Sequence, residues 1–185
     1  MTEKDILNLI SADPWMMGIL RVAKNQKLPD WMVGAGFVRN KVWDHLHGFE
    51  NERVPTNDID LIYFDTICLD RDINRALSAK LTKESGTKWE VVNQAYTHTW
   101  HNRLPYKNTE EALADWVETP TCVAVSMLDN EKLKLHAPLG INDLVGLVVR
   151  RNEAYSDSIS YENRVTSKKW QEKWPKLQII HDEVN

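Results

Sequence analysis

Residues 57–65 read N-D-I-D-L-I-Y-F-D, a stretch that predicts a β-strand because most of its side chains are β-branched, aliphatic or aromatic. It opens with Asp58 and Asp60. In a strand, residues i and i+2 point to the same face of the sheet, so these two carboxylates are expected side by side. At about 5 Å and an effective dielectric near 20, two such charges repel by roughly 3 kcal/mol. A divalent cation would offset this repulsion, and Asp58 and Asp60 are therefore the predicted metal ligands.

The segment before this strand predicts a phosphate site. Residues 31–33 predict a short buried strand that runs into Gly34-Ala35-Gly36, and apolar residues at four-residue spacing predict a helix over 37–47. Glycines in a strand-to-helix turn let the backbone approach a ligand closely, and the free N–H groups that start the helix favour an anion. Arg39 could add a charge-assisted hydrogen bond to a phosphate. The predicted phosphate-binding residues are Gly34, Ala35, Gly36 and Arg39.

Each of these signals also has an ordinary structural explanation. Asp58 could be a turn residue after Asn57, Asp60 an edge charge, and the glycines a tight turn. It is their order along the chain, with strand, glycine turn, helix and second strand in succession, that favours a functional site. A phosphate cradle beside a pair of metal ligands is typical of phosphoryl or nucleotidyl transfer.

The remaining pattern predicts one α+β domain spanning residues 1–185, with a core at about 28–150 and a helical extension at about 153–185. Residues 49–57 and 95–108 are expected to be loops. Further predicted strands are 88–92, 121–128 and 133–137, the last two as a hairpin. Further predicted helices are 3–12, 16–26, 70–83, 109–116 (capped by Thr109), 141–150 and 161–174.

The composition limits the classes of partner. The chain is 42% hydrophobic and 27% charged, with a formal net charge of −4, which gives no strong sign of nucleic-acid binding. Its two cysteines lie far apart in sequence, which argues against a disulfide framework or a cysteine zinc site. The first twenty residues do not look like a signal peptide, and no apolar run approaches the roughly 18 residues that cross a bilayer. We expect a cytoplasmic protein with no membrane partner.

Three blocks of the sequence resemble a little-characterised bacterial family of nucleotidyltransferase-like proteins, a branch of the DNA polymerase beta-like nucleotidyltransferase superfamily. They read V-G-A-G-F-V-R-N, D-I-D-L-I-Y-F-D and W-E-V-V-N-Q-A-Y-T-H-T-W. The similarity continues through T-P-T-C-V-A-V and H-A-P-L-G-I-N-D-L to R-V-T-S-K-K-W-Q-E-K-W-P-K-L, so it covers nearly the whole chain.

This resemblance implies a small mixed β-sheet flanked by helices, followed here by a C-terminal helix. It implies that the turn at 34–36 holds a triphosphate, and that Asp58 and Asp60 bind Mg²⁺ or Mn²⁺. Many members add a third carboxylate as the base for the attacking hydroxyl; Glu90 is the best-placed candidate and Asp65 the second. The chain departs from the family pattern in having Gly-Ala-Gly, which removes a hydroxyl that often touches phosphate, and a longer gap before Asp58.

The function expected from these features is Mg²⁺-dependent transfer of a nucleoside monophosphate from a nucleoside triphosphate to an unknown hydroxyl acceptor, with a small molecule favoured over a polymer. The alternative is a nucleotide-binding or regulatory module that has lost transfer. Arg164 and Lys168, four residues apart, could reach the phosphates or the acceptor if the last helix folds back over the cleft, although a charged helix face is most often solvated.

Overall fold

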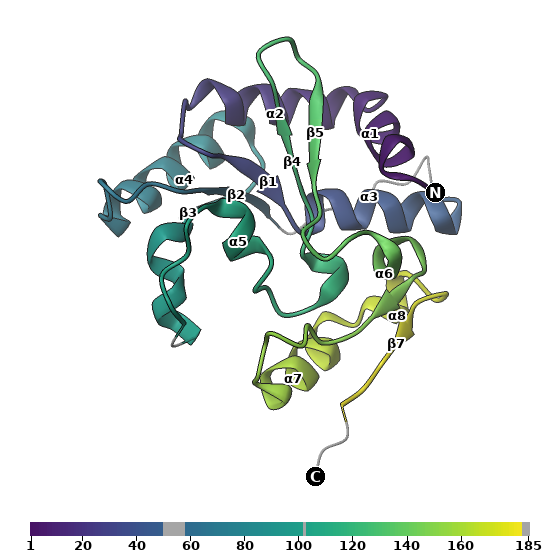
Figure 1. The fold of residues 1–185 in the computed structure, drawn as a ribbon. Coiled ribbons are helices and arrows are strands. Elements are labelled where there is room, and N and C mark those ends of the chain that lie inside the picture. The colour runs from purple at the N-terminus through teal and green to yellow at the C-terminus, as the bar shows by residue number, and fades with distance from the viewer. Residues whose placement is uncertain (50–57, 102, 183–185) are drawn as a thin grey trace.

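The centre of the molecule is a five-stranded mixed sheet, seen in a computed structural model that describes residues 1–49, 58–101 and 103–182 (Figure 1). Its strand order is β3-β2-β1-β4-β5, with β2 and β3 parallel and the other neighbours antiparallel. The bounds are β1 Met32–Gly34, β2 Ile59–Tyr63, β3 Trp89–Asn93, β4 Ala124–Met127 and β5 Leu133–His136. The predicted α+β class with a mixed sheet is confirmed. The predicted loop at 49–57 lies, apart from Phe49, outside the described residues.

One face of the sheet is covered by the first four helices. These are α1 Glu3–Ser11, α2 Pro14–Asn25, α3 Gly36–His47 and α4 Arg71–Ser85. Side chains of β2 that point to this face, such as Ile59 and Leu61, are fully buried in the main hydrophobic cluster. Sequence signals set the helix ends: Asp13 caps α2 with Pro14 in its first turn, and Gly48 ends α3 in the left-handed conformation.

The opposite face of the sheet carries a much smaller apolar cluster. Met32, Ile62, Leu113 and Ala124 form it, with the ring of Trp116 packed against them. Because side chains alternate along a strand, Asp60 and Glu90 lie on this same face as Ile62. This lightly covered face is where the fold leaves room for a site.

The C-terminal segment packs beneath the sheet (Figure 1). It contains α6 Asn142–Val145, α7 Ser158–Lys168, α8 Trp170–Lys173 and a two-stranded parallel sheet of β6 Val148–Val149 with β7 Gln178–Ile179. Trp174 Nε1 donates a hydrogen bond of 2.8 Å to Asp44 on α3, and the rings of Trp170 and Trp174 pack edge-on against Trp43. The division into a core and an extension stays a prediction. None of the described helices is long and apolar enough to span a membrane.

Four predicted elements differ from the structure. The predicted loop at 95–108 begins with a 3₁₀-helix, η1 Gln94–His101, and the predicted helix at 109–116 is only α5 Thr109–Leu113, capped by Asn108 rather than Thr109. The predicted helix at 141–150 stops at Val145, because the chain turns at Leu147 (φ 58°) to form β6. The predicted last helix is divided at Lys169, which is left-handed (φ 50°). A further short 3₁₀-helix, η2, spans Thr119–Thr121.

Candidate functional site

Three carboxylates meet at the start of β2 and β3. The parallel register pairs Asp60 with Glu90, and Asp58 precedes Asp60 by two residues. One carboxylate oxygen from each of the three lies within 4.8 Å of the others. Hard divalent cations such as Mg²⁺ bind oxygen ligands of this kind, so the donor set fits such an ion. Asp65, the second candidate for a third carboxylate, instead accepts hydrogen bonds from the N–H groups of Ile67 and Cys68.

The carboxylate cluster is electrostatically unfavourable without a cation. Burial first, and then the charges of Asp58 and Glu90, raise the pKa of Asp60 to about 7, although Arg39 and Arg164 act in the opposite direction. Lys88 Nζ lies 3.4 Å from Asp58 Oδ2, but both side chains are partly solvated, so this pair offsets little of the repulsion.

The turn between β1 and α3 is strained at its central residue. Ala35, and neither glycine, has a positive φ, with φ 47° and ψ −116°. This region of backbone conformation favours glycine, and strain of this kind gathers at ligand sites. Gly34 leaves room for the ring of Trp116: a Cβ there would lie 3.2 Å from that ring, closer than ordinary van der Waals contact. No described side chain caps the start of α3, which leaves backbone N–H groups there for an anion.

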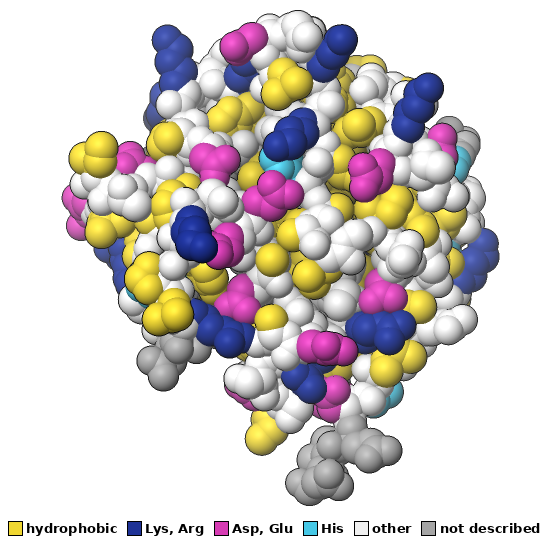
Figure 2. Space-filling view, viewed as in Figure 1, with side chains coloured by type: hydrophobic (Ala, Val, Ile, Leu, Met, Phe, Trp, Pro, Cys, Tyr) yellow, Lys and Arg dark blue, Asp and Glu magenta, His cyan; other side chains and the backbone are white. Residues whose placement is uncertain are grey.

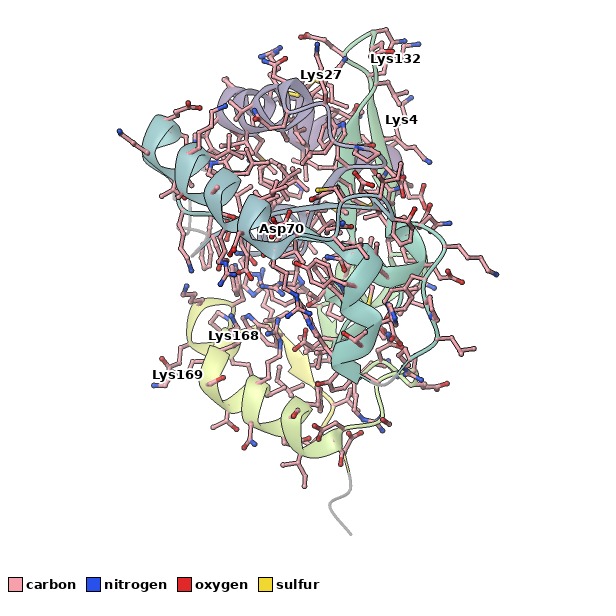
Figure 3. All side chains as sticks on the ribbon, turned by 90° about the vertical axis from the view of Figure 1, so that its left-hand side faces the viewer. Lys4, Lys27, Asp70, Lys132, Lys168 and Lys169 are labelled. Carbon is pink, nitrogen blue, oxygen red and sulfur yellow. The ribbon has the colours of Figure 1, made fainter. Side chains whose placement is uncertain are left out.

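A charged pocket of about 80 Å³ joins this turn to the carboxylates. Cationic side chains from α3, α7 and α8 face Asp58 and Asp60 across it, and side-chain nitrogens gather between the sheet and α7 in Figure 3. The residues that line the charged pocket are Ala35, Gly36, Arg39, Asn40, Asp58, Asp60, Arg164, Lys168, Trp170, Lys173 and Trp174. The C-terminal helix therefore does fold back, and it brings Arg164 and Lys168 to the predicted phosphate site.

The side chain of Arg39 is buried and is held in place by its neighbours. Its guanidinium lies 4.9 Å from the ring centres of both Trp43 and Trp170, and it donates to Thr121 Oγ1 (2.9 Å) and Asn40 Oδ1. Burial lowers its pKa to about 10, yet it stays cationic at neutral pH. Arg39 thus supplies a fixed positive charge at the base of the charged pocket, and its contact with a phosphate stays a prediction.

Two residues of the site had no place in the sequence prediction. Glu118 is fully buried and pairs with Arg164, which fixes that guanidinium where the charged pocket meets the carboxylates. Lys173 shares the charged pocket with Lys168 because the break at Lys169 turns α8 toward the site. No sequence signal identifies Glu118, since one buried glutamate in an isolated β-bridge has no characteristic spacing.

Comparison with known proteins identifies the family of the chain. A family model described as nucleotidyltransferase matches residues 21–179. An NMR structure described as revealing a CCA-adding enzyme head domain is 28% identical, with a TM-score of 0.87, and the match covers 98% of this chain and 97% of that one. No curated protein matches the chain.

The similarity to two larger structures concerns the fold alone. A Thermotoga maritima CCA-adding enzyme complexed with tRNA is 15% identical with a TM-score of 0.56, and a CCA-adding enzyme with ATP is 13% identical with a TM-score of 0.57. The match covers 98% and 94% of this chain but only 43% and 42% of those chains. The family model and the similarity to the CCA-adding enzyme head domain together support nucleotidyl transfer as the general chemistry. The chain belongs to the nucleotidyltransferase family whose model spans residues 21–179.

Proposed function

We propose that this protein transfers a nucleoside monophosphate from a nucleoside triphosphate to a hydroxyl acceptor, with Mg²⁺ or Mn²⁺ as cofactor. The observation that carries the proposal is the charged pocket, in which an uncapped helix start and four cationic side chains share one lining with the carboxylates of Asp58 and Asp60. A triphosphate with its metal ion has the complementary charges.

Each group has a distinct role in this proposal. Asp58 and Asp60 hold the divalent cation, which when bound neutralises phosphate charge and polarises the reacting phosphoryl group. The turn at 34–36, Arg39, Arg164 and Lys168 hold the triphosphate. Glu90, exposed at the edge of the cluster, takes the proton of the attacking hydroxyl.

In the transfer step one phosphorus–oxygen bond forms and another breaks. The acceptor oxygen forms a bond to the α-phosphorus, and the bond from that phosphorus to the oxygen bridging the α- and β-phosphates breaks. Pyrophosphate leaves with the bonding electrons, and the hydroxyl proton passes to the Glu90 carboxylate. Because attack and departure are in line, the leaving pyrophosphate and the acceptor lie on opposite sides of the phosphorus.

Calorimetric titration with ATP, CTP, GTP and UTP, with and without Mg²⁺ or Mn²⁺, tests the proposal. We expect metal-dependent binding of at least one triphosphate, and loss of it in Asp58→Asn. The matched control is Asp129→Asn, an equal change of charge at a fully exposed carboxylate in the β4–β5 turn. If a triphosphate binds but no pyrophosphate is released in the presence of hydroxyl acceptors, the protein is a nucleotide-binding module that has lost transfer. If no triphosphate binds, both the transferase and the nucleotide-binding module are rejected.

A further inference from the structure

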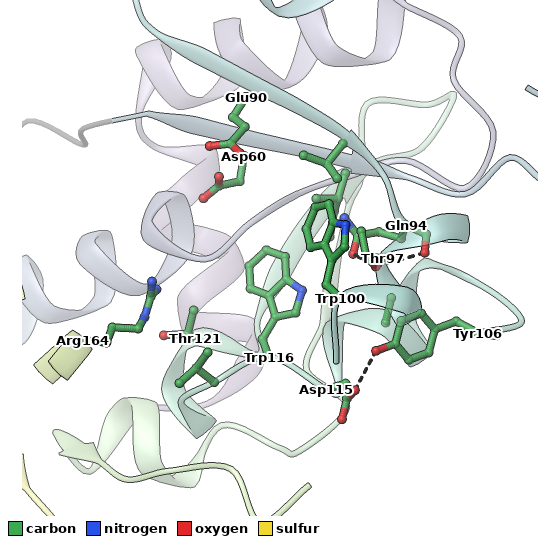
Figure 4. A pocket seen from close by; sticks show the side chains of 14 residues that line it. Asp60, Glu90, Gln94, Thr97, Trp100, Tyr106, Asp115, Trp116, Thr121 and Arg164 are labelled. Carbon is green, nitrogen blue, oxygen red and sulfur yellow. Dashed lines mark hydrogen bonds between the residues drawn. The ribbon is translucent and has the colours of Figure 1, made fainter. Parts of the chain in front are cut away.

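A second pocket, here called the aromatic pocket, adjoins the charged pocket at Asp60 and is shown in Figure 4. Its volume is about 290 Å³, and it shares Asp60 and Arg164 with the charged pocket. Its walls contain the rings of Trp100, Tyr106 and Trp116. The two pockets therefore meet at the carboxylates, with different chemistry on each side.

The in-line geometry of the proposed function decides which substrate the aromatic pocket receives. If pyrophosphate leaves into the charged pocket, the attacking hydroxyl has to approach from the opposite side. Glu90, the proposed proton acceptor, lines the aromatic pocket and not the charged one, whereas Asp58 lines only the charged one. The acceptor is thus expected in the aromatic pocket.

The charges around the aromatic pocket disfavour an anionic acceptor. It is lined by three carboxylates (Asp60, Glu90 and Asp115) and by one guanidinium, that of Arg164. Asp115 is paired with Arg103 (3.1 Å), so the repulsion of an anion comes mainly from Asp60 and Glu90. Arg164 is already paired with the buried Glu118. On the face of the molecule shown in Figure 2, acidic and basic side chains are interspersed without a continuous basic area, so that face offers no obvious track for a polyanion.

The shape and polarity of the aromatic pocket favour a planar ring. Trp116 is fixed by its packing beside Gly34, and Trp100 is 54% exposed, so its ring surface is available to a ligand. Indole faces bind planar rings and cations. On the same 3₁₀-helix as Trp100, the Thr97 hydroxyl lies within hydrogen-bonding distance of the backbone carbonyl (3.1 Å) and the side-chain oxygen (3.2 Å) of Gln94. Gln94 lines the pocket, and its amide group can hydrogen-bond to a polar atom of the ligand.

We propose that the aromatic pocket binds the acceptor, and that this acceptor is a small hydroxyl-bearing molecule with an aromatic ring and no net negative charge. This inference rests on the proposed function. It requires that the ring lie against Trp100 and Trp116 with its hydroxyl directed toward Glu90.

The test uses pairs of probes that differ mainly in charge. Tyramine and 4-hydroxyphenylacetate share a phenol ring, as adenosine and adenosine 5′-monophosphate share a nucleoside; a single-stranded RNA trinucleotide represents a polymer. Dissociation constants are measured by ligand-observed NMR on wild type, on Trp100→Ala and on Leu104→Ala. Leu104 is 87% exposed in the segment after η1 and does not line the aromatic pocket, so it is the matched control.

We expect the uncharged or cationic member of a pair to bind on the order of tenfold more tightly than its anionic partner. Trp100→Ala should weaken that binding about fivefold or more, since a stacked ring contributes on the order of 1 kcal/mol, and Leu104→Ala should not. Affinity for the nucleoside triphosphate, titrated separately, should be the same in all three proteins.

Four results would overturn the inference: no binding of either non-anionic probe at millimolar concentration, equal affinity within the pairs, tighter Trp100-dependent binding of the trinucleotide, or loss of triphosphate affinity in Trp100→Ala. The third would assign the pocket to a polynucleotide and the fourth to the base of the triphosphate. Failure of the proposed function looks different, because wild type would then bind no triphosphate whether or not the probes bind.

Discussion

Replacing Asp58 by Asn should make the metal-free protein more stable and at the same time remove its response to divalent cations. The carboxylate oxygens of Asp58 and Asp60 lie within 4.8 Å of each other. At an effective dielectric of 20 their repulsion is about 3 kcal/mol. Solvation and the partly exposed Lys88 reduce this, so we expect the free energy of unfolding at pH 8 to rise by about 1–2 kcal/mol. For a chain of this size that is an increase in Tm of roughly 2–8 °C.

The assay is thermal and urea unfolding at pH 8, in EDTA and in MgCl₂ or MnCl₂. Wild type should gain about 1.4 kcal/mol at a metal concentration ten times the Kd, and Asp58→Asn should gain almost nothing. Asp129→Asn should match wild type in both media, because its carboxylate is exposed and distant from the cluster. The reasoning is refuted if Asp58→Asn is no more stable than wild type in EDTA, or if its metal response is undiminished.

Other residues give predictions that unfolding experiments can check. The pKa of Asp60 is raised to about 7 from a usual value near 4, so between these two pH values the folded state binds a proton that the unfolded state has lost. The free energy of unfolding in EDTA should therefore fall by at most about 4 kcal/mol as pH rises from 4 to 8. Asp60→Asn should flatten this fall. Ala35→Gly should relieve the positive φ and stabilise the protein by about 1 kcal/mol in urea unfolding; a loss of stability would contradict the strain. Asn93→Ala removes side-chain bonds to backbone groups of Asp65, Cys68 and Ala95 and should cost about 2–4 kcal/mol by the same measurement. The control Asn130→Ala removes one exposed hydrogen bond from Lys132 N–H and should cost less. Arg164→Ala leaves Glu118 buried without its partner and should lower the free energy of unfolding by about 3–5 kcal/mol. Adding Glu118→Gln to this variant should restore part of the loss. If the effects of the two substitutions simply add in the double mutant, the two residues are not coupled.

The sequence predicted the parts of the site that depend on local pattern. Alternation along β2 placed Asp58 and Asp60 together, and the glycine turn marked the start of α3. The strand 88–92 placed Glu90 near them once the family resemblance was considered, and the parallel register with β2 accounts for that placement. Asn93, the last residue of β3, hydrogen-bonds to backbone groups of Asp65 and Cys68, a role typical of a side-chain amide at a strand end.

What the sequence could not predict depends on tertiary contacts. The break at Lys169 has no glycine or proline to signal it; packing of Trp170 and Trp174 against Trp43 holds it in place. Pairing of β6 with β7 likewise ends α6 early, against the apolar periodicity of 141–150. The aromatic pocket draws its walls from segments far apart in sequence. The predicted loop at 95–108 is rich in aromatic residues and histidine, but this composition does not show that Trp100 and Tyr106 meet Trp116.

Asp60 and Glu90 are paired across two parallel strands. The site therefore tolerates residues inserted at some positions of the segment that connects β2 to β3, and not at others. The crossover between the strands runs through α4, whose residues contribute nothing to the carboxylate cluster. Residues added to the exposed turn at 66–69 should leave the cluster intact. A single residue inserted between Gly86 and Trp89 that shifted the register of β3 would turn Glu90 to the opposite face of the sheet. Among natural variants of this fold, we therefore expect insertions before α4 and a fixed spacing after it.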